Sequence, residues 1–386
     1  MISVSADQKQ ALHAIAAWLN SPTDFITMGG YAGTGKTTLI AVIRKLLAKS
    51  TKRKNIRVAF ASFTGRATQN LQNKLRAQKV IFPNDSCSTI HGLLYYQIVD
   101  TNGSHVGWKK RGKLDYDLII IDEASMVTNE LWNDLLSYRI PILAVGDHGQ
   151  LPPVGESFNL MDAPMLRLEH IHRQAVGNPI LDLATKARLG EEIAFDRYSA
   201  IVKKMHKHSE DATDLLENSL AVAREDTLLL VGRNKTRVAL NSQARAARGY
   251  ETQDPIVRDK VVCLRNTYDN EDGAIYNGML GEIITLERHD EHRYRAQIAF
   301  EDEERTYAGF INKSQFGSPT TLSKKQIKKD TGDLFDFGYA LTVHKAQGSQ
   351  AKKVILFDES YCFREDAHRW LYTAITRAEQ ELYILA

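Results

Sequence analysis

Cysteine is scarce in this sequence, and long hydrophobic runs are absent. The three cysteines among 386 residues are odd in number and far apart, at Cys87, Cys263 and Cys362, so they indicate neither a disulfide framework nor a zinc cluster. No apolar run approaches the ~20 residues that span a bilayer, and the first residues lack the basic and apolar segments of a signal peptide. We therefore expect a soluble protein of a reducing, intracellular compartment.

A strong excess of either charge is also absent. Lys and Arg number 50 against 47 for Asp and Glu, which gives a formal net charge of +3. This balance excludes a histone-like protein, so any nucleic-acid site must be a local stripe of charge. The length predicts about two to three domains with large buried cores.

Short, continuously apolar runs recur between stretches of helical pattern. Such runs are typical of strands that are buried on both faces of a parallel sheet. They cover residues 25–28, 58–61, 118–121, 142–145, 227–231, 354–357 and 382–385. One group precedes residue ~175 and the other follows residue ~220, which predicts an α/β protein of two lobes.

Two segments depart from this rhythm. Residues 95–99 and 104–108 flank an Asn-Gly step at 102–103, which favours the tight turn of a β-hairpin. From Gly281 to about Phe316, polar and apolar residues alternate as in an antiparallel sheet. We expect a hairpin inserted in the first lobe and a small β-domain inserted in the second.

A phosphate-binding loop follows the first apolar run. Residues 30–37 match G-x-x-x-x-G-K-[ST], in the strand–loop–helix context that this motif requires. Its glycines let backbone N–H groups surround phosphate oxygens, Lys36 reaches the β and γ phosphates, and the Thr37 hydroxyl ligates Mg²⁺. The predicted nucleotide-binding residues of this loop are Gly30, Gly33, Gly35, Lys36, Thr37 and Thr38.

Two carboxylates, Asp122 and Glu123, end the apolar run at 118–121. The carboxyl end of a parallel strand faces the ligand crevice in such folds. We expect Asp122 to hold the magnesium shell and Glu123 to polarise the attacking water. An isolated Asp-Glu pair is more often a solvated strand end, but its pairing with the phosphate loop favours the catalytic interpretation.

Gln8 lies three residues after Ser5 in a capping box. Its simplest role is to close the first helix by bonding back to Ser5. The alternative, a contact with the nucleotide base, is not favoured by the spacing alone.

The order of further motifs resembles superfamily 1 helicases, particularly the RecD-like branch (superfamily 1B), over nearly the whole chain. Residues 61–67, 88–91 and 146–154 resemble motifs Ia, Ib and III, and residues 171–174, 341–348 and 372–378 resemble motifs IV, V and VI. The resemblance implies an ATP-dependent DNA helicase that translocates 5′ to 3′ on single-stranded DNA and unwinds duplex DNA.

The resemblance also implies the domain organisation. Two RecA-like P-loop lobes with parallel sheets would comprise residues 1–91 with 113–175, and 176–280 with 335–386. The inserted hairpin would cover residues 92–112, and an SH3-like insertion would cover residues 281–334.

Further site residues follow from the resemblance by position. Gln8 resembles the adenine-reading glutamine, Gln150 the γ-phosphate sensor, and Arg173 and Arg377 resemble arginine fingers, while Gly348 joins the ATP-binding set. Contacts with the sugar-phosphate backbone of single-stranded DNA are expected from Thr64, Thr89, His91, Asn234, Thr342, His344 and Lys345. For each of these, a loop or helix-cap role is the alternative.

The hairpin resembles in position a wedge held against the duplex fork. Apolar or flat side chains on its strands and the turn at its tip form the predicted pin, which comprises Val99, Asn102, Gly103, His105, Val106 and Trp108. A surface hairpin that only covers the lobe is the alternative.

The expected cofactors are ATP and Mg²⁺, and the expected substrates are single-stranded DNA and a duplex fork. We further expect a monomer without membrane contact, in the cytoplasm (the nucleoid or an infected cell), with a single-strand-binding protein or replication partner. Two rivals differ in class: a helicase-nuclease, which needs a second metal cluster, and a nucleotide-dependent DNA switch or clamp without strand separation. Lys36, Glu123, Gln150 and Arg377 favour the motor, because a switch does not need every hydrolytic group.

Overall fold

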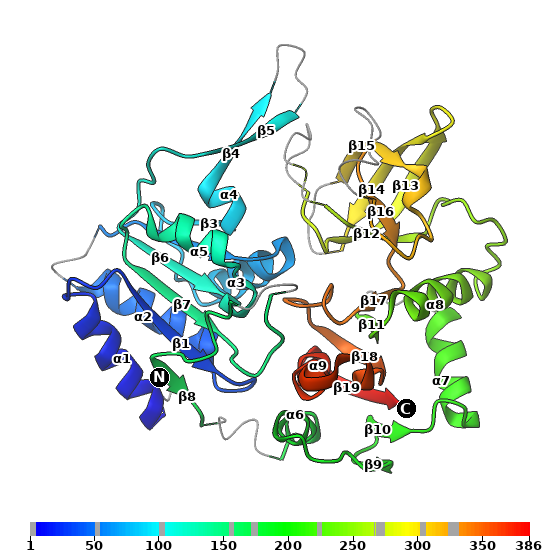
Figure 1. Ribbon diagram of the computed structural model, residues 1–386, viewed down its shortest axis with the longest axis horizontal. Helices are drawn as coiled ribbons and strands as arrows, with labels where there is room; N and C mark the ends of the chain where they lie inside the picture. Colours follow the sequence, from blue (N-terminus) through cyan, green and yellow to red (C-terminus); the bar gives the residue numbers. More distant parts are fainter. Residues whose placement is uncertain are drawn as a thin grey trace. The chain divides into compact units, whose positions relative to one another are not determined.

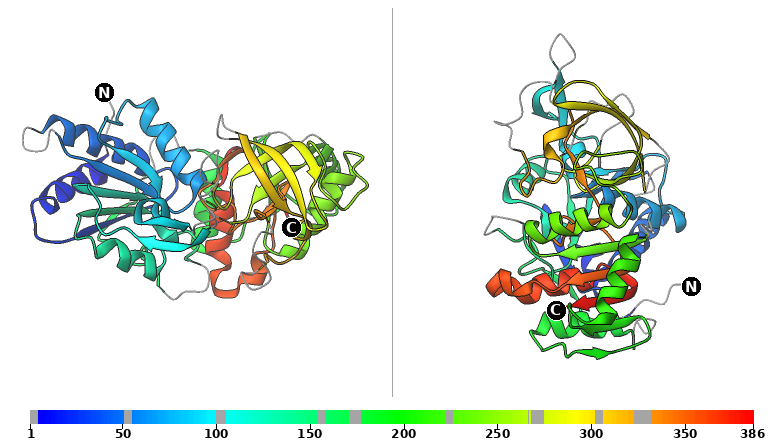
Figure 2. Two further views of the ribbon diagram at one scale, coloured as in Figure 1. Left: turned by 90° about the horizontal axis from the view of Figure 1, so that it is seen from above. Right: turned by 90° about the vertical axis from the view of Figure 1, so that its right-hand side faces the viewer.

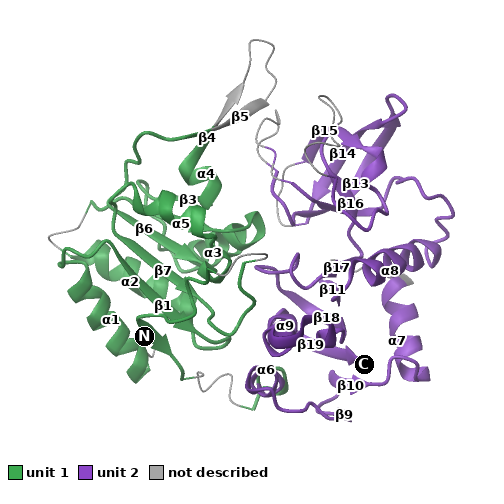
Figure 3. Ribbon diagram, in the orientation of Figure 1, with its two compact units in different colours: residues 1–181 green, residues 182–386 purple. Residues whose placement is uncertain are grey.

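The computed structural model describes residues 5–50, 55–99, 105–153, 158–170, 177–221, 226–265, 267, 275–301, 306–322 and 332–386. The chain divides into two compact units, residues 1–181 and 182–386 (Figures 1 and 3). In the described part of the chain, no helix has the length and apolarity needed to cross a membrane.

Unit 1 is built on a parallel six-stranded sheet with the order β3-β2-β6-β7-β1-β8. Its four inner strands are the four apolar runs that the sequence predicts in this part of the chain, because strands buried on both faces have no polar side. The strands are β1 (Phe25–Gly30), β2 (Val58–Ser62), β3 (Ser86–Thr89), β6 (Leu118–Asp122), β7 (Ile142–Gly146) and β8 (Leu166–Leu168).

Helices cover both faces of this sheet (Figure 2). Successive residues of β6 alternate between two cores: Leu118 and Ile120 pack with α1, α2 and α3, while Ile119 and Ile121 pack with α4 and α5. The helices are α1 (Ala6–Trp18), α2 (Lys36–Lys49), α3 (Gly65–Ala77), α4 (Ile90–Leu94) and α5 (Asn129–Leu136), with a short turn η1 (Ala124–Met126) after β6. The sheet thus brings the carboxyl ends of β1, β6 and β7 to one edge.

A two-stranded antiparallel hairpin, β4 (Tyr95–Val99) with β5 (His105–Lys110), extends from α4. Its base is held by α5, because Lys110 forms an ion pair with Asp134 and the Tyr95 hydroxyl bonds to the same carboxylate. Of the predicted pin, Asn102 and Gly103 and the side chains of Val99, His105, Val106 and Trp108 lie outside the described residues. The wedge therefore stays a prediction.

Unit 2 contains a second six-stranded sheet with the order β17-β11-β18-β19-β10-β9, parallel except for the edge strand β9. Its strands are β9 (Asp196–Arg197), β10 (Val202–Met205), β11 (Thr227–Val231), β17 (Ala340–Thr342), β18 (Ala351–Phe357) and β19 (Ala378–Leu385). The accompanying helices are α6 (Pro179–Leu189), α7 (Glu210–Ala221), α8 (Asn234–Ala246) and α9 (Ala367–Ile375), with a short helix η4 (Ser360–Asp366) before α9.

The unit also carries a five-stranded antiparallel sheet, in the order β15-β14-β13-β12-β16, with its own apolar core. Its strands are β12 (Lys260–Cys263), β13 (Leu280–Arg288), β14 (Arg293–Phe300), β15 (Thr306–Asn312) and β16 (Phe335–Phe337), and a turn η3 (Lys313–Gln315) follows β15.

The predicted bounds of this domain, residues 281–334, are too narrow, because β12 and β16 belong to the same sheet. Both strands are short and buried at every position, so they lack the alternation that marks β14. The SH3-like class of the domain stays a prediction.

Candidate nucleotide site and nucleic-acid interface

The loop between β1 and α2 has the geometry of an anion site. Gly33 and Gly35 have φ of 81° and 77°, a left-handed conformation that a side chain disfavours. Gly35 is the N-cap of α2. A Cβ on Gly30 would meet Thr34 Oγ1 at 2.6 Å, so glycine lets the loop close on itself. The N–H groups at the start of α2 are therefore available to an anion.

Lys36 places its amine over this loop. Its Nζ donates to the carbonyl oxygens of Gly30 at 2.7 Å and Tyr31 at 3.1 Å, and lies 3.6 Å from Asp147 Oδ2. Asp147 is fully buried just after β7 and accepts the Gly149 N–H at 2.9 Å. Sequence reasoning missed Asp147 as a site residue, although it follows a buried strand in the same way as Asp122.

Asp122 and Glu123 lie at the end of β6, as predicted. Burial and the neighbouring Glu123 carboxylate raise the pKa of Asp122 to about 6, although Lys36 opposes the shift. Glu123 has φ of 55°, a strained conformation for a residue with a side chain. Its Oε2 is buried with no hydrogen-bond partner among the described residues. A buried carboxylate oxygen needs a donor or cation, and a bound water molecule is one such donor.

Gln150 contributes a second unpartnered oxygen at the same edge of the sheet. It is 4% exposed, its N–H donates to Asp147 O at 3.2 Å, and its Oε1 has no partner in the described part of the chain. The ends of β6 and β7 lie close together, because a Cβ on Gly146 would be 3.0 Å from Ser125 N. The predicted water-polarising and phosphate-sensing residues thus share one edge of the sheet.

The residues present fit Mg²⁺ bound together with a nucleotide. Thr37 in the first turn of α2 and Asp122 at the end of β6 supply hard oxygen ligands. Across the described ranges, no group of three or more His, Cys, Asp or Glu is arranged to hold a metal. One hydroxyl and one carboxylate, from Thr37 and Asp122, are typical of a magnesium site that takes its other ligands from phosphate oxygens and water.

Gln8 closes the first helix as the capping box predicts, while its contact with the nucleotide base stays a prediction. Its Oε1 accepts the Ser5 N–H at 3.1 Å, as in a capping box. Its Nε2 donates to the Thr34 carbonyl of the phosphate loop at 2.9 Å. Helix α1 is thereby attached to the nucleotide site.

Asp7 attaches the same helix to a second segment. Its Oδ2 accepts the N–H groups of Glu169 at 3.1 Å and His170 at 3.0 Å. This segment leads in sequence toward Arg173, which lies outside the described residues together with the rest of 171–176.

In unit 1, the predicted DNA contacts Thr64 and Thr89 are helix N-caps. Thr64 Oγ1 accepts the Ala67 N–H at 3.2 Å, and Thr89 Oγ1 accepts the Gly92 N–H at 3.1 Å. The cap interpretation is therefore correct for both. It is compatible with a DNA role, because a hydroxyl that accepts a hydrogen bond in the cap can donate its own proton to a phosphate oxygen. His91 is half-buried beside Phe63 and Tyr95, and burial lowers its pKa.

In unit 2, the turn after β17 carries three predicted DNA contacts. Thr342 Oγ1 accepts the Lys345 N–H at 3.4 Å, and the His344 ring lies 5.4 Å from that of Phe363. Gly348 at the end of this turn has φ of 76°. Burial is the main cause that lowers the pKa of Lys345 to about 8.

Arg377 is held inside unit 2. Its Nε donates to Thr373 O at 3.0 Å, its Nη1 to Ser349 O at 3.2 Å, and its Nη2 to Thr376 Oγ1 at 3.1 Å, with 3% of the residue exposed. The guanidinium is therefore fixed between α9 and the turn that carries Gly348. Its role as an arginine finger stays a prediction.

The glycine-rich loop, its lysine and the buried carboxylates at the ends of adjacent parallel strands define a P-loop nucleotide-binding protein. Residues 3–208, more than half of the chain, match the AAA domain family, and residues 337–385 match the UvrD-like helicase C-terminal domain. The chain belongs to the AAA domain family, and its similarity to RecD proteins identifies it as a RecD-like helicase of superfamily 1B.

Similar proteins cover nearly the whole chain. It is 26% identical over 375 residues to the ATP-dependent RecD2 DNA helicase of Deinococcus radiodurans, and the alignment covers 93% of this chain and 46% of RecD2. It is 24% identical over 452 residues to the RecD subunit of the RecBCD enzyme of Buchnera aphidicola, which covers 98% of this chain and 73% of that subunit. The chain therefore spans about half the length of RecD2.

Two solved Pif1 helicase structures have a similar fold. One, from a study of two coordinating Pif1 helicases at forked DNA, has a TM-score of 0.58, 17% identity, and coverage of 100% of this chain and 92% of that chain. The other, Pif1 from Bacteroides with ADP-AlF3 and single-stranded DNA, has a TM-score of 0.56, 17% identity, and coverage of 100% and 93%. This likeness supports the α/β fold with RecA-like lobes.

Proposed function

We propose that this protein is an ATP-dependent DNA helicase that moves 5′ to 3′ on single-stranded DNA and separates the strands of a duplex. One observation carries the proposal: Glu123 and Gln150 each have a buried oxygen, at the sheet edge next to the phosphate loop, that has no hydrogen-bond partner among the described residues. A nucleotide switch needs the loop and the metal carboxylate alone, whereas hydrolysis also needs groups that hold a water molecule.

The residues of unit 1 have distinct roles in the proposed hydrolysis. Lys36 would exchange the carbonyls of Gly30 and Tyr31 for β and γ phosphate oxygens. Thr37 and Asp122 would hold Mg²⁺, which neutralises charge on these phosphates. Glu123 would accept the proton of the water that attacks the γ phosphorus, and Gln150 would detect the γ phosphate.

Arg173 and Arg377 are proposed to add positive charge to the transferring phosphoryl group. For Arg377 this requires the guanidinium to exchange some of its bonds within unit 2 for phosphate contacts. The Ser349 carbonyl, just after the turn of His344 and Lys345, accepts a hydrogen bond from the same arginine. If Arg377 contacts the nucleotide as proposed, this bond would connect the nucleotide to the proposed DNA contacts.

The DNA substrate is supported by the relatives, whereas the proposed direction of movement rests on the order of the motifs alone. RecD2 is named an ATP-dependent DNA helicase, and the Bacteroides Pif1 structure contains single-stranded DNA. In this chain, the proposed backbone contacts are hydroxyls, an amide, imidazoles and an amine, which suit recognition of phosphates without reading sequence. We extend the proposal to a cytoplasmic monomer that works with a single-strand-binding or replication partner.

ATP turnover with and without single-stranded DNA tests this function. We expect DNA to stimulate turnover, and Glu123→Gln to bind ATP normally but hydrolyse it at least ~100-fold more slowly, because an amide cannot accept the proton. Lys36→Ala should instead weaken ATP binding itself. Simultaneous loss of ATP binding and hydrolysis in a folded Glu123→Gln variant would make Glu123 a metal or structural residue.

A further inference from the structure

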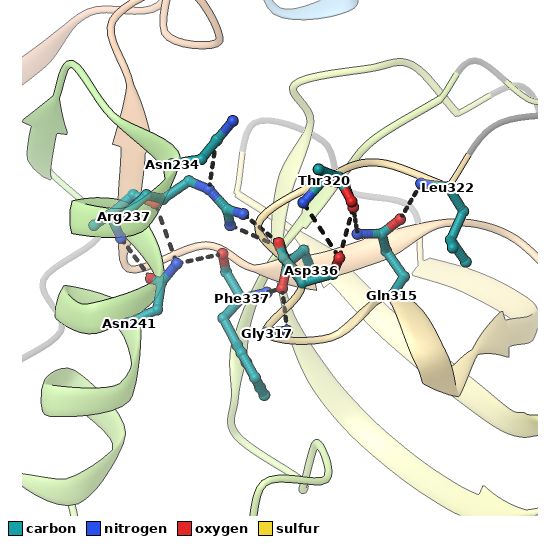
Figure 4. A network of polar contacts seen from close by, with 11 residues as sticks. Asn234, Arg237, Asn241, Gln315, Gly317, Thr320, Leu322, Asp336 and Phe337 are labelled. Atoms are coloured by element: carbon teal, nitrogen blue, oxygen red, sulfur yellow. Dashed lines mark hydrogen bonds and ion pairs between the residues drawn. The ribbon is translucent and has the colours of Figure 1, made fainter.

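Helix α8 is joined to the base of the antiparallel sheet by buried polar side chains (Figure 4). Asn234, Arg237 and Asn241 share one face of the helix, since three- and four-residue steps return to the same side. Arg237 Nη1 donates to Asp336 Oδ2 on β16 at 2.7 Å, and the two side chains are 6% and 1% exposed. Its Nη2 donates to Ser318 O at 2.7 Å, in the segment after η3.

Asp336 and Asn241 complete the junction. Asp336 Oδ1 accepts the N–H groups of Gly317 and Phe337, each at 2.8 Å. Asn241 donates to Phe337 O at 3.1 Å and accepts the Ala340 N–H at 2.8 Å. These bonds fix the strand β16 where the chain passes from the antiparallel sheet into the parallel one.

The same guanidinium contacts a proposed DNA residue. Arg237 Nε donates to Asn234 Oδ1 at 3.2 Å. This bond sets which way the amide is turned, because the carbonyl end faces Arg237 and the NH₂ end therefore faces away from it. A single arginine thus bonds to the β-domain on one side and to the first residue of α8 on the other.

We propose that Arg237 is a positioning residue for single-stranded DNA: bound to Asp336, it orients the Asn234 amide toward the strand and couples that contact to the inserted β-domain. This inference rests on the proposed DNA-binding function. Arg237 itself is buried and does not touch DNA in this account.

Lys345 gives the proposal a second readout. The charged or titratable groups that act on Lys345 are Arg237 on α8, Asp336 on β16 and Cys263 on β12. Burial and the Arg237 charge lower the pKa of Lys345, whereas Asp336 and Cys263 raise it. The resulting pKa is about 8. Lys345 therefore loses its proton at a lower pH than an ordinary lysine does. Removal of the Arg237 charge should raise this pKa, so the loss of DNA affinity on raising the pH should move to higher pH.

The chain offers a matched control on the same helix. Arg245 Nε donates to Asp259 Oδ1 at 2.9 Å, with side chains 5% and 0% exposed, so it forms another buried pair between α8 and the base of the antiparallel sheet. No hydrogen bond among the described residues joins Arg245 to a proposed DNA contact. Arg245→Gln and Arg237→Gln therefore each remove a buried ion pair between α8 and the antiparallel sheet. The two variants differ because Arg237 is also hydrogen-bonded to the proposed DNA contact Asn234.

The experiment measures the affinity of these full-length variants for a fluorescent oligothymidine by anisotropy from pH 7 to 9.5, together with thermal unfolding. We expect Arg237→Gln to weaken binding about tenfold at pH 7 and to shift the pH midpoint upward. Arg237→Lys should restore part of the affinity, and Arg245→Gln should keep the wild-type affinity and pH profile despite a lower unfolding temperature. Equal affinities and pH profiles for the two Gln variants would overturn the positioning role, whereas absence of wild-type binding would overturn the proposed function itself.

A double-mutant cycle provides a test that does not depend on the stability of Arg237→Gln. If Arg237 acts through Asn234, the double variant Asn234→Ala with Arg237→Lys should bind oligothymidine as weakly as Asn234→Ala alone. Additive losses would show that Arg237 does not act through Asn234.

Discussion

Arg377 is a proposed catalytic residue that is held firmly within its own unit. All three of its side-chain nitrogens donate hydrogen bonds within unit 2. Lysine has the charge but not the planar fork of arginine, so it cannot reproduce these bonds. The residue thus combines a structural role, which is visible, with a proposed catalytic one.

We predict that Arg377→Lys leaves ATP affinity nearly unchanged and lowers DNA-stimulated turnover by about 10³-fold, the lower end of the effect of an arginine finger. Steady-state turnover and equilibrium binding of a fluorescent ATP analogue would separate the two effects. Arg364→Lys, at an exposed position of the same unit, is the control. Wild-type turnover in Arg377→Lys would place Arg377 outside the catalytic site.

Residues that follow a recognisable motif could be predicted from the sequence, whereas residues that act by burial could not. Lys36 lies in the phosphate-loop motif, and Asp122 and Glu123 directly follow an apolar run, so the sequence pattern indicates all three positions. Arg237 lies in the first turn of a polar helix, where an arginine normally indicates a solvated face. Only the fold shows that Asp336, 99 positions later, neutralises its charge.

At the scale of elements, the side chain of Asp7 joins α1 to residues 169–170 of the same unit. Burial opposes its ionisation, but hydrogen bonds from the Ser5 hydroxyl and from the N–H groups of His170, Gln8 and Glu169 outweigh burial and lower the pKa. A carboxylate whose pKa is lowered by folding stabilises the folded state at any pH above its unfolded pKa. That contribution disappears as the pH falls through the lowered value.

Asp7→Asn should therefore reduce the free energy of unfolding by about 1 kcal/mol at pH 7. Urea unfolding of the two proteins at pH 7 and near pH 3 would measure this difference. Because Asp7 becomes protonated in the wild type at low pH, the difference should shrink toward pH 3. A destabilisation of equal size at both pH values would show that charge is not the cause.

The hairpin β4–β5 is the element proposed to divide the strands of a duplex. Replacement of residues 101–104 by a shorter turn, with trimmed strands, should abolish unwinding and leave DNA-stimulated ATP turnover largely intact. The hairpin base is bonded to α5 through Asp134, which the trimmed variant retains. Unimpaired unwinding would refute the wedge, and a parallel loss of ATP turnover would show that the hairpin supports the fold of unit 1.

The elements differ in how well the sequence predicts them. The four inner strands of the unit 1 sheet are mostly apolar and were predictable, whereas β3 (Ser86–Thr89) has only Ser, Cys and Thr and gives no apolar signal. The strands β12 and β16 are buried throughout, so their pairing with the antiparallel sheet depends on partners far away in the sequence.

At the scale of the whole molecule, each of the two units contains a mainly parallel sheet with its own core, and one of them carries the antiparallel insertion. Continuous apolar strands predicted this duplication, because each lobe needs strands buried on both faces. The order of the motifs along the chain supplied the functional interpretation. The pairing of α8 with the β-domain is a property of the folded chain alone.

The central claim is directional strand separation driven by ATP, and a fluorescent strand-displacement assay tests it most directly. The substrates are two duplexes that differ only in whether the single-stranded tail is 5′ or 3′, each with wild-type protein, ATP and Mg²⁺. We expect rapid displacement from the 5′-tailed duplex, little from the 3′-tailed duplex, and none from either with Glu123→Gln. DNA-stimulated ATP turnover without displacement from either duplex would instead indicate a DNA-dependent clamp or switch.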